Sequence, residues 1–137
     1  MTEALRSLIY TSVPSRPLSS EELGDIARKS AAVNALDGLT GLLLFNGHFF
    51  VQVLEGSTSA INAAMERISR DARHHSINVI EQIEIPARNF ASWDMALFEV
   101  GPSWLAARKD LDALLPANVA PAVRALIQDS LQHASAN

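Results

Sequence analysis

The stretch "LTGLLLFNGHFFVQVLEG", residues Leu39 to Gly56, contains two apolar runs separated by Asn46-Gly47. An Asn-Gly pair between apolar runs is typical of a two-residue hairpin turn. We therefore predict a β-hairpin with arms over residues 39–45 and 49–55. Side chains alternate along a strand, so one face of the second arm carries Phe50, Gln52 and Leu54, and the other carries Phe49, Val51 and Val53. Both faces are apolar, and we expect both to be covered.

Gln52 is the exception in this hairpin, because it places an amide inside a strand that is otherwise apolar. A buried amide without hydrogen-bond partners costs about 1–3 kcal/mol. Either the fold satisfies Gln52 internally, or another polar group lies against its face of the strand.

The segments around the hairpin alternate between strand and helix patterns. We predict strands over residues 5–12, 76–85 and 95–100, and helices over 19–37, 57–71, 103–115 and 121–134. Ser19 and Glu22 form a capping-box signal at the start of the first helix, and Gly38 is a stop signal at its end. In the first strand, Leu8 and Tyr10 share one face.

This order is β-α-β-β-α-β-β followed by two helices, which matches the ferredoxin-like pattern. We expect an α+β fold in which two helices cover one face of the sheet and two C-terminal helices cover the other. Residues 1–100 would form the core, and residues 101–137 a helical extension that covers the sheet.

Composition narrows the class of function. The chain has 137 residues, 48% of them hydrophobic, which suits one domain with a core. The net charge of −4 and the lack of a long basic run disfavour direct binding to nucleic acid or to a membrane. The absence of cysteine excludes disulfides and thiolate sites and fits a cytoplasmic location, which we expect. The N-terminus lacks a signal-peptide pattern.

Familiar catalytic motifs are missing. There is no phosphate-binding loop and no dinucleotide-binding glycine pattern. The histidines are His48, His74, His75 and His133, and the adjacent pair does not have metal-ligand spacing, so we expect no metal. Ser30, His74 and Asp71 supply the residue types of a Ser-His-Asp triad, but nothing in the sequence places a serine on a strand-to-helix elbow, so we do not expect a hydrolase of this type.

A set of polar residues is spread over predicted neighbouring elements: Tyr10, Ser30, Asn34, Gln52, Arg67, Asp71 and His74. Each has an ordinary structural explanation, such as a helix cap for Asn34 or a surface ion pair for Arg67 and Asp71. Taken together they point to a site. In a ferredoxin-like sheet the first and third strands are central neighbours, so Tyr10 and Gln52 would meet between the two helices. Such a slot suits a planar, partly polar ring.

The chain resembles the BLUF family of blue-light sensors that use flavin. The resemblance lies in "SLIYTS", "SAAVNALDGLTGLLLFNGHFFVQVLEG", "RISRDARHH" and "FASWDMALFEV", in the family's order and at about its spacing, over roughly Leu5 to Val100. It implies non-covalently bound FAD, with the ring between the two helices.

The resemblance also implies roles for individual residues. Tyr10 is similar to the photoactive tyrosine, and Gln52 to the switching glutamine between that tyrosine and the flavin. The remaining flavin-pocket positions match Ser30, Asn34, Arg67, Asp71 and His74. Trp93 and Met95 match a tryptophan and a methionine on the last strand that, in the family, are thought to exchange places or move next to the glutamine. Ala31 and Val33 depart from the family's more polar pattern, and we expect weaker FAD retention but intact photochemistry.

By this resemblance, light drives electron and proton transfer from Tyr10 through Gln52, which rearranges hydrogen bonds to the flavin. The sensor would not be an enzyme, and would signal to a protein partner or through a homo-oligomer. Two alternatives stay open: a small flavin-dependent reductase or hydrolase, for which His74 is the one candidate acid or base, and an interaction module without a cofactor.

Overall fold

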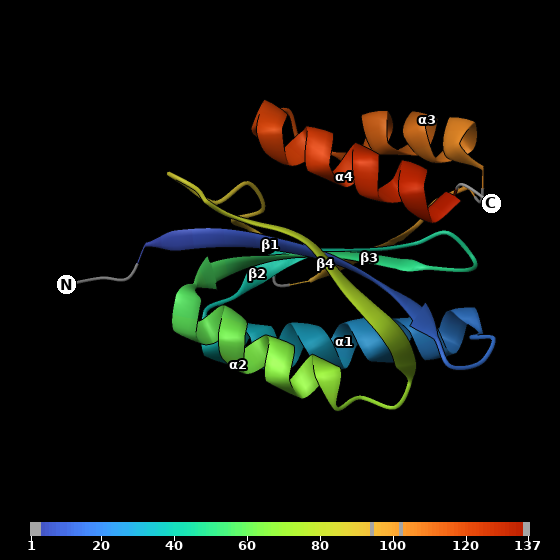
Figure 1. Ribbon diagram of the computed structural model, residues 1–137, viewed down its shortest axis with the longest axis horizontal. Helices are drawn as coiled ribbons and strands as arrows, with labels where there is room; N and C mark the ends of the chain where they lie inside the picture. Colours follow the sequence, from blue (N-terminus) through green and yellow to red (C-terminus); the bar gives the residue numbers. More distant parts are fainter. Residues whose placement is uncertain (1–3, 94, 102, 136–137) are drawn as a thin grey trace.

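A five-stranded sheet forms the centre of the structure, a computed structural model that describes residues 4–93, 95–101 and 103–135. Its strands are β1 (Leu5–Pro14), β2 (Thr40–Phe45), β3 (Phe50–Ser57), β4 (His74–Glu84) and β5 (Ala96–Glu99). They lie in the order β4-β1-β3-β2-β5, and every pair is antiparallel except β2 with β5 (Figure 1). The predicted ferredoxin-like α+β fold is confirmed.

Helices cover both faces of this sheet. The first pair, α1 (Ser20–Asp37) and α2 (Thr58–Ser69), lies on one face, and the second pair, α3 (Trp104–Leu114) and α4 (Pro121–Ser135), lies on the other (Figure 1). The start of α1 has the predicted capping box, since Ser19 Oγ accepts from Glu22 N at 3.1 Å and Glu22 Oε1 accepts from Ser19 N at 3.3 Å. Its end is Gly38, whose φ of 71° is a left-handed conformation that favours glycine.

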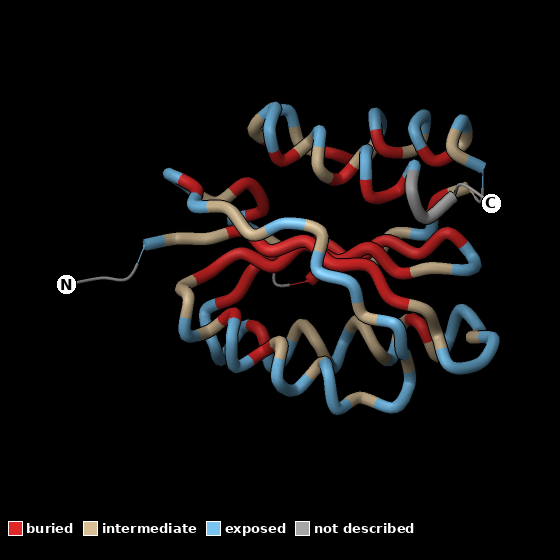
Figure 2. The backbone as a smooth tube through the Cα atoms, viewed as in Figure 1, coloured by how far each residue is buried: buried red, intermediate tan, exposed pale blue. Residues whose placement is uncertain are grey.

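Strand alternation divides the core into two layers. Ile9, Val51 and Val53 pack with α3 and α4, whereas Leu8, Tyr10 and Leu54 pack with α1 and α2. The central strands are buried almost throughout, whereas the residues of β4, at the edge of the sheet, are all half-buried or exposed (Figure 2). Gln52 therefore faces α1 and α2, as the alternation predicted.

The hairpin turn differs from the prediction. A four-residue loop, residues 46–49, replaces the two-residue turn, and β3 begins at Phe50. The Asn46 side chain organises this loop, because its Oδ1 accepts from His48 N at 3.0 Å and from Phe49 N at 2.7 Å. An asparagine side chain that accepts from the backbone N–H groups two and three residues later stabilises such a loop, so the tighter two-residue turn is not needed.

Two strand limits also differ. β4 begins at His74, two residues before the predicted start, because Val13 and Pro14 extend β1 and pair with the two histidines. β5 begins only at Ala96, so Trp93 and Met95 both precede the strand that was predicted to carry them.

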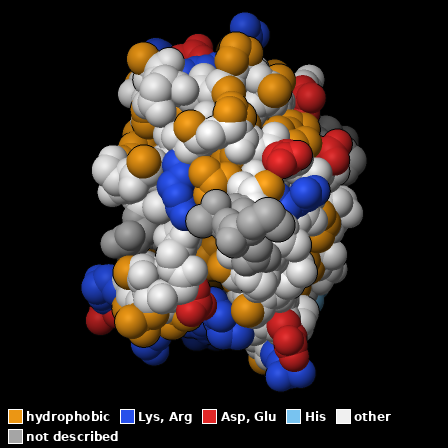
Figure 3. Space-filling model, turned by 90° about the vertical axis from the view of Figure 1, so that its left-hand side faces the viewer, with side chains coloured by type: hydrophobic (Ala, Val, Ile, Leu, Met, Phe, Trp, Pro, Cys, Tyr) orange, Lys and Arg blue, Asp and Glu red, His pale blue; other side chains and the backbone are white. Residues whose placement is uncertain are grey.

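Among the described residues, no helix has the length and apolar character needed to cross a bilayer. One end of the molecule shows basic, acidic and hydrophobic side chains interspersed (Figure 3). No cluster of three potential metal-ligating side chains occurs in the described part of the chain, which does not include the side chain of His133.

Candidate functional site

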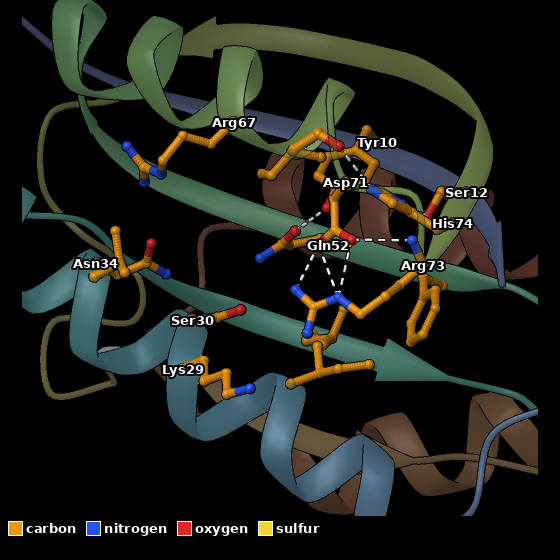
Figure 4. Close-up of a pocket in the computed structure, with 15 residues that line it drawn as sticks. Tyr10, Ser12, Lys29, Ser30, Asn34, Gln52, Arg67, Asp71, Arg73 and His74 are labelled. Carbon is orange, nitrogen blue, oxygen red and sulfur yellow. Dashed lines mark hydrogen bonds and ion pairs between the residues drawn. The ribbon is translucent and has the colours of Figure 1, made fainter. Parts of the chain in front are cut away.

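A cavity of about 260 Å³ lies between α1 and α2, above the face of the sheet that carries Gln52 (Figure 4). Its walls are partly apolar, with Ile26 from α1, Leu43 and Phe50 from the hairpin, and Ile68 from α2. Its polar lining includes every pocket position predicted from the sequence: Tyr10, Ser30, Asn34, Gln52, Arg67, Asp71 and His74.

Tyr10 and Gln52 lie opposite each other on β1 and β3, as the strand register requires. The Tyr10 hydroxyl donates a hydrogen bond to Gln52 Oε1, and both side chains are buried. Gln52 Nε2 donates in turn to Met95 Sδ at 3.4 Å. The three side chains thus form one chain of hydrogen bonds, and the amide in the apolar strand is satisfied on both sides.

Trp93 takes no part in this chain. Its ring lies 5.3 Å from that of Phe90 and 5.6 Å from that of Phe98, in the core layer beneath α3 and α4. Met95 belongs to the opposite layer. The two candidates on this segment are thus on opposite sides of the sheet, and Met95 is the one that contacts Gln52.

The Tyr10 phenol is held in its neutral form. Burial raises the pKa of the Tyr10 hydroxyl well above its ordinary value of 10.0, and the negative charge of Asp71 raises it further. The hydroxyl proton therefore stays on Tyr10 at neutral pH, available for the bond to Gln52.

His74 is fixed at the edge of the cavity by both ring nitrogens. Its Nδ1 lies 2.8 Å from Ser12 Oγ, and its Nε2 lies 2.9 Å from the carbonyl oxygen of Ile68. With both nitrogens engaged by the protein, the imidazole is poorly placed to exchange protons with a substrate in the cavity.

Arg67 and Asp71, which were both expected on the second helix, do not pair with each other. α2 ends at Ser69 and Arg70 is its C-cap, so Asp71 is off the helix and the i,i+4 spacing does not apply. Arg67 instead forms an ion pair with Asp37 at the end of α1, at 3.0 Å, which ties the two helices together. Figure 4 shows Asn34 and Arg67 toward one end of the cavity and Asp71 toward the other.

Asp71 pairs with Arg73, a residue that the sequence did not single out. Arg73 Nε lies 2.9 and 3.0 Å from the two Asp71 carboxylate oxygens. The hydrogen bonds from this guanidinium lower the pKa of Asp71. Lys29 also lines the cavity, and among the described residues it forms no ion pair. The sequence analysis named neither cation as a site residue, although Arg73 lies within the quoted motif "RISRDARHH", and the structure identifies both by their place in the cavity lining.

The cavity fits a flavin ring. A helix that merely covered a sheet would bury its inner stripe, yet Ile26 and Ser30 of α1 stay half-buried and Val33 is 39% exposed, because all three face the cavity. The buried amides of Asn34 and Gln52 offer donors and acceptors to the polar edge of such a ring, and the apolar walls suit its faces.

Comparison with known proteins agrees with this fit. Residues 5–96 match the family model described as BLUF, sensors of blue light using FAD. The chain is 32% identical over 93 residues to photoactivated adenylate cyclase subunit alpha of Euglena gracilis, covering 66% of this chain and 9% of that protein. It is 36% identical over 80 residues to the blue light- and temperature-regulated antirepressor BluF of Escherichia coli strain K12, covering 58% of this chain and 19% of that protein.

A solved structure described as the dark state of BlrB, a BLUF protein, is similar over nearly its whole length. It has a TM-score of 0.72 and 31% identity, and the match covers 97% of this chain and 98% of that one. The two curated relatives are much longer than the part that the chain matches. The family model covers well over half of the chain, and the chain accordingly belongs to the BLUF family, the sensors of blue light that use FAD.

Proposed function

We propose that Tyr10 and Gln52 carry the light response in this chain. The observation that supports this is the hydrogen-bond chain from Tyr10 Oη to Gln52 Oε1 and from Gln52 Nε2 to Met95 Sδ, of which Tyr10 and Gln52 line the cavity. When bound, FAD supplies the absorption of blue light and an excited state that takes up an electron.

Tyr10 is the electron and proton donor. It is the one tyrosine in the chain, and its proton points along the hydrogen bond to Gln52 Oε1. As the phenol loses an electron it becomes a strong acid, so the proton moves along this bond to the Gln52 oxygen. When electron and proton return to Tyr10, the Gln52 amide is left rotated or as a tautomer.

Rotation has a defined consequence for Met95. It exchanges the amide oxygen and nitrogen of Gln52, so the oxygen faces the sulfur. A thioether has no proton to donate, and the Gln52–Met95 hydrogen bond is lost. The light state is thus a changed set of partners around Gln52, and no covalent bond to the protein is formed.

We further propose that Ser30, Asn34, Arg67, Asp71 and His74 hold the flavin ring. Lys29 lines the same cavity without an ion-pair partner among the described residues, and its charge suits the phosphates of FAD. Val33 presents an apolar side chain to the cavity, whereas Ala31 packs into the core layer beneath α1. Weaker FAD retention stays a prediction.

We propose that residues 1–100 form the flavin-binding core and 101–137 an extension that passes the signal to a protein partner or to a second copy. The blue-light-regulated antirepressor among the relatives supports output through a protein contact. A cytoplasmic location stays a prediction. The engaged state of His74 disfavours the reductase alternative, and the family is one of sensors.

Absorption spectroscopy of Tyr10→Phe tests the proposal. This variant keeps the ring and loses only the hydroxyl, so we expect it to bind FAD and to show no light-induced spectral shift. Ser12→Ala is the matched control, because it removes a hydroxyl of the cavity lining that bonds His74 and not Gln52, and it should keep the light-induced shift. A normal light response in Tyr10→Phe would falsify the assignment of Tyr10.

A further inference from the structure

Glu55 is a fully buried acidic residue that the flavin site does not use. It lies on β3, three residues after Gln52, and alternation places its side chain with Val51 and Val53 beneath α3 and α4. Its Oε1 accepts from Thr40 Oγ1 at 3.0 Å and from Phe90 N at 2.9 Å. Its Oε2 accepts from Asn89 N at 2.7 Å and Asn89 Nδ2 at 3.1 Å. The carboxylate thus ties β3 to the segment between β4 and β5.

Asn89 also bonds in the opposite direction, toward α4. Its Oδ1 accepts from Ala120 N at 2.7 Å, and its carbonyl oxygen accepts from Asn118 Nδ2 at 3.1 Å. Ala120 immediately precedes α4, and its own carbonyl accepts from Arg124 N at 2.9 Å, which closes the first turn of that helix. One buried side chain therefore joins the carboxylate of β3 to the start of α4 (Figure 1 shows these elements).

The same segment leads to Met95. Trp93 N donates to the Phe90 carbonyl at 2.9 Å, and the Trp93 carbonyl accepts from Gly41 N at 2.9 Å. Met95 follows two residues later and contacts Gln52. The segment is thus attached to Gln52 through Met95 at one end and to α4 through Asn89 at the other.

We propose that Asn89 is a positioning residue that transmits the rearrangement at Gln52 to the first turn of α4, with Glu55 holding it in place. This proposal rests on the light response of Gln52 argued above. Rotation of the Gln52 amide breaks the Gln52–Met95 bond and so releases one attachment of the segment. Hydrogen bonds weaken steeply with misalignment, so a shift of Asn89 either carries Ala120 with it or weakens that bond. Both results change how often the backbone hydrogen bonds of the first turn of α4 break and re-form.

Hydrogen–deuterium exchange of the FAD-loaded protein, in the dark and under blue light, measures the opening of these bonds. We expect illumination to change the exchange rate at the start of α4, around Arg124, several-fold in the unsubstituted protein. Asn89→Ala removes the two side-chain bonds, from Asn89 Nδ2 to Glu55 and from Ala120 N to Asn89 Oδ1, and keeps the bond from the backbone N–H of residue 89 to Glu55. It should keep the light-induced absorption shift and lose most of the exchange response in α4.

Asn46→Ala is the matched control. Asn46 is also a buried asparagine that accepts two backbone hydrogen bonds, but it lies in the hairpin loop. It should keep both the absorption shift and the α4 response. If Asn89→Ala does not fold, Ala120→Pro deletes the donor N–H while leaving Asn89 and Glu55 in place, and it should lose the response in the same way.

A full α4 response in Asn89→Ala, or in Ala120→Pro where the first does not fold, overturns the proposal. So does a normal absorption shift without any α4 response in the unsubstituted protein. Absence of the absorption shift itself in the unsubstituted protein would instead refute the proposed function, so the two failures are distinct.

Discussion

Replacing Glu55 with glutamine should destabilise the folded protein severely, although the two side chains are nearly isosteric. Among the described residues, every hydrogen-bond partner of the Glu55 carboxylate is a donor: the Thr40 hydroxyl, the backbone N–H groups of Asn89 and Phe90, and the Asn89 amide. A carboxylate accepts from all four, whereas a glutamine must present an NH₂ group to one pair. The Thr40 hydroxyl can rotate to accept, but either orientation leaves the Asn89 or the Phe90 backbone N–H without an acceptor.

The magnitude follows from burial. Glu55 has 0% exposure, so water does not replace the lost acceptor. The loss of bonds to a charged group and one orphaned buried N–H together cost about 2–4 kcal/mol in the free energy of unfolding. For a chain of this size, about 4 °C per kcal/mol lowers the Tm by about 8–16 °C.

Urea and thermal unfolding of the FAD-loaded protein in the dark, followed by far-ultraviolet circular dichroism, measure the effect. Glu66→Gln is the control. Glu66 bonds Arg70 at 2.8 Å on α2, and its side chain is 64% exposed, so its loss should change the free energy of unfolding by less than about 1 kcal/mol. A Glu55→Gln protein as stable as Glu66→Gln would refute the argument that this carboxylate fixes the segment before β5.

Three further predictions concern the site and the sheet. Tyr10 is the one tyrosine, so absorbance at 295 nm reports its ionisation, and because burial raises its pKa in the folded protein, phenolate should form only well above pH 10.0. The free energy of unfolding should fall as pH rises from 10.0, whereas ionisation at the ordinary pKa would contradict the burial of Tyr10. In Arg73→Ala the pKa of Asp71, followed by carboxyl ¹³C NMR, should rise toward its ordinary 3.8, and an unchanged titration would exclude the ion pair. In the unsubstituted protein, the stability that comes from the lowered pKa of Asp71 is present above pH 3.8 and is lost as pH falls below that value. Gly41→Ala should lower the free energy of unfolding, measured in urea, by about 3 kcal/mol or more, because its Cβ would lie 1.9 Å from the Val53 carbonyl oxygen. Gly24→Ala, whose Cβ would meet only the flexible Arg28 side chain, should be neutral or stabilising, and equal stabilities of the two variants would contradict the close approach of β2 to β3.

The features with a periodic pattern were predictable from the sequence. Alternation placed Gln52 on one face of the hairpin and Tyr10 on one face of the first strand, and the element order then made β1 and β3 neighbours. The capping box and Gly38 gave the limits of α1. These signals are local, so a single sequence contains them.

The remaining features depend on irregular backbone. Asp71 was associated with Arg67 by helical spacing, but α2 ends at Ser69 and Asp71 pairs with Arg73. Two of the partners of the Glu55 carboxylate, Asn89 and Phe90, lie more than thirty residues away in a segment that has no periodic pattern. Their approach is set by packing of the whole chain, and no local rule predicts it.

The most direct test of the account compares the absorption spectrum of the FAD-loaded protein before, during and after blue light, for the unsubstituted chain and for Gln52→Leu. The substitution keeps the volume of the side chain and removes the amide that joins Tyr10 to Met95. We expect a reversible shift to longer wavelength in the unsubstituted chain and none in Gln52→Leu. A Gln52→Leu protein that binds FAD and shifts like the unsubstituted chain would contradict the central role of this amide.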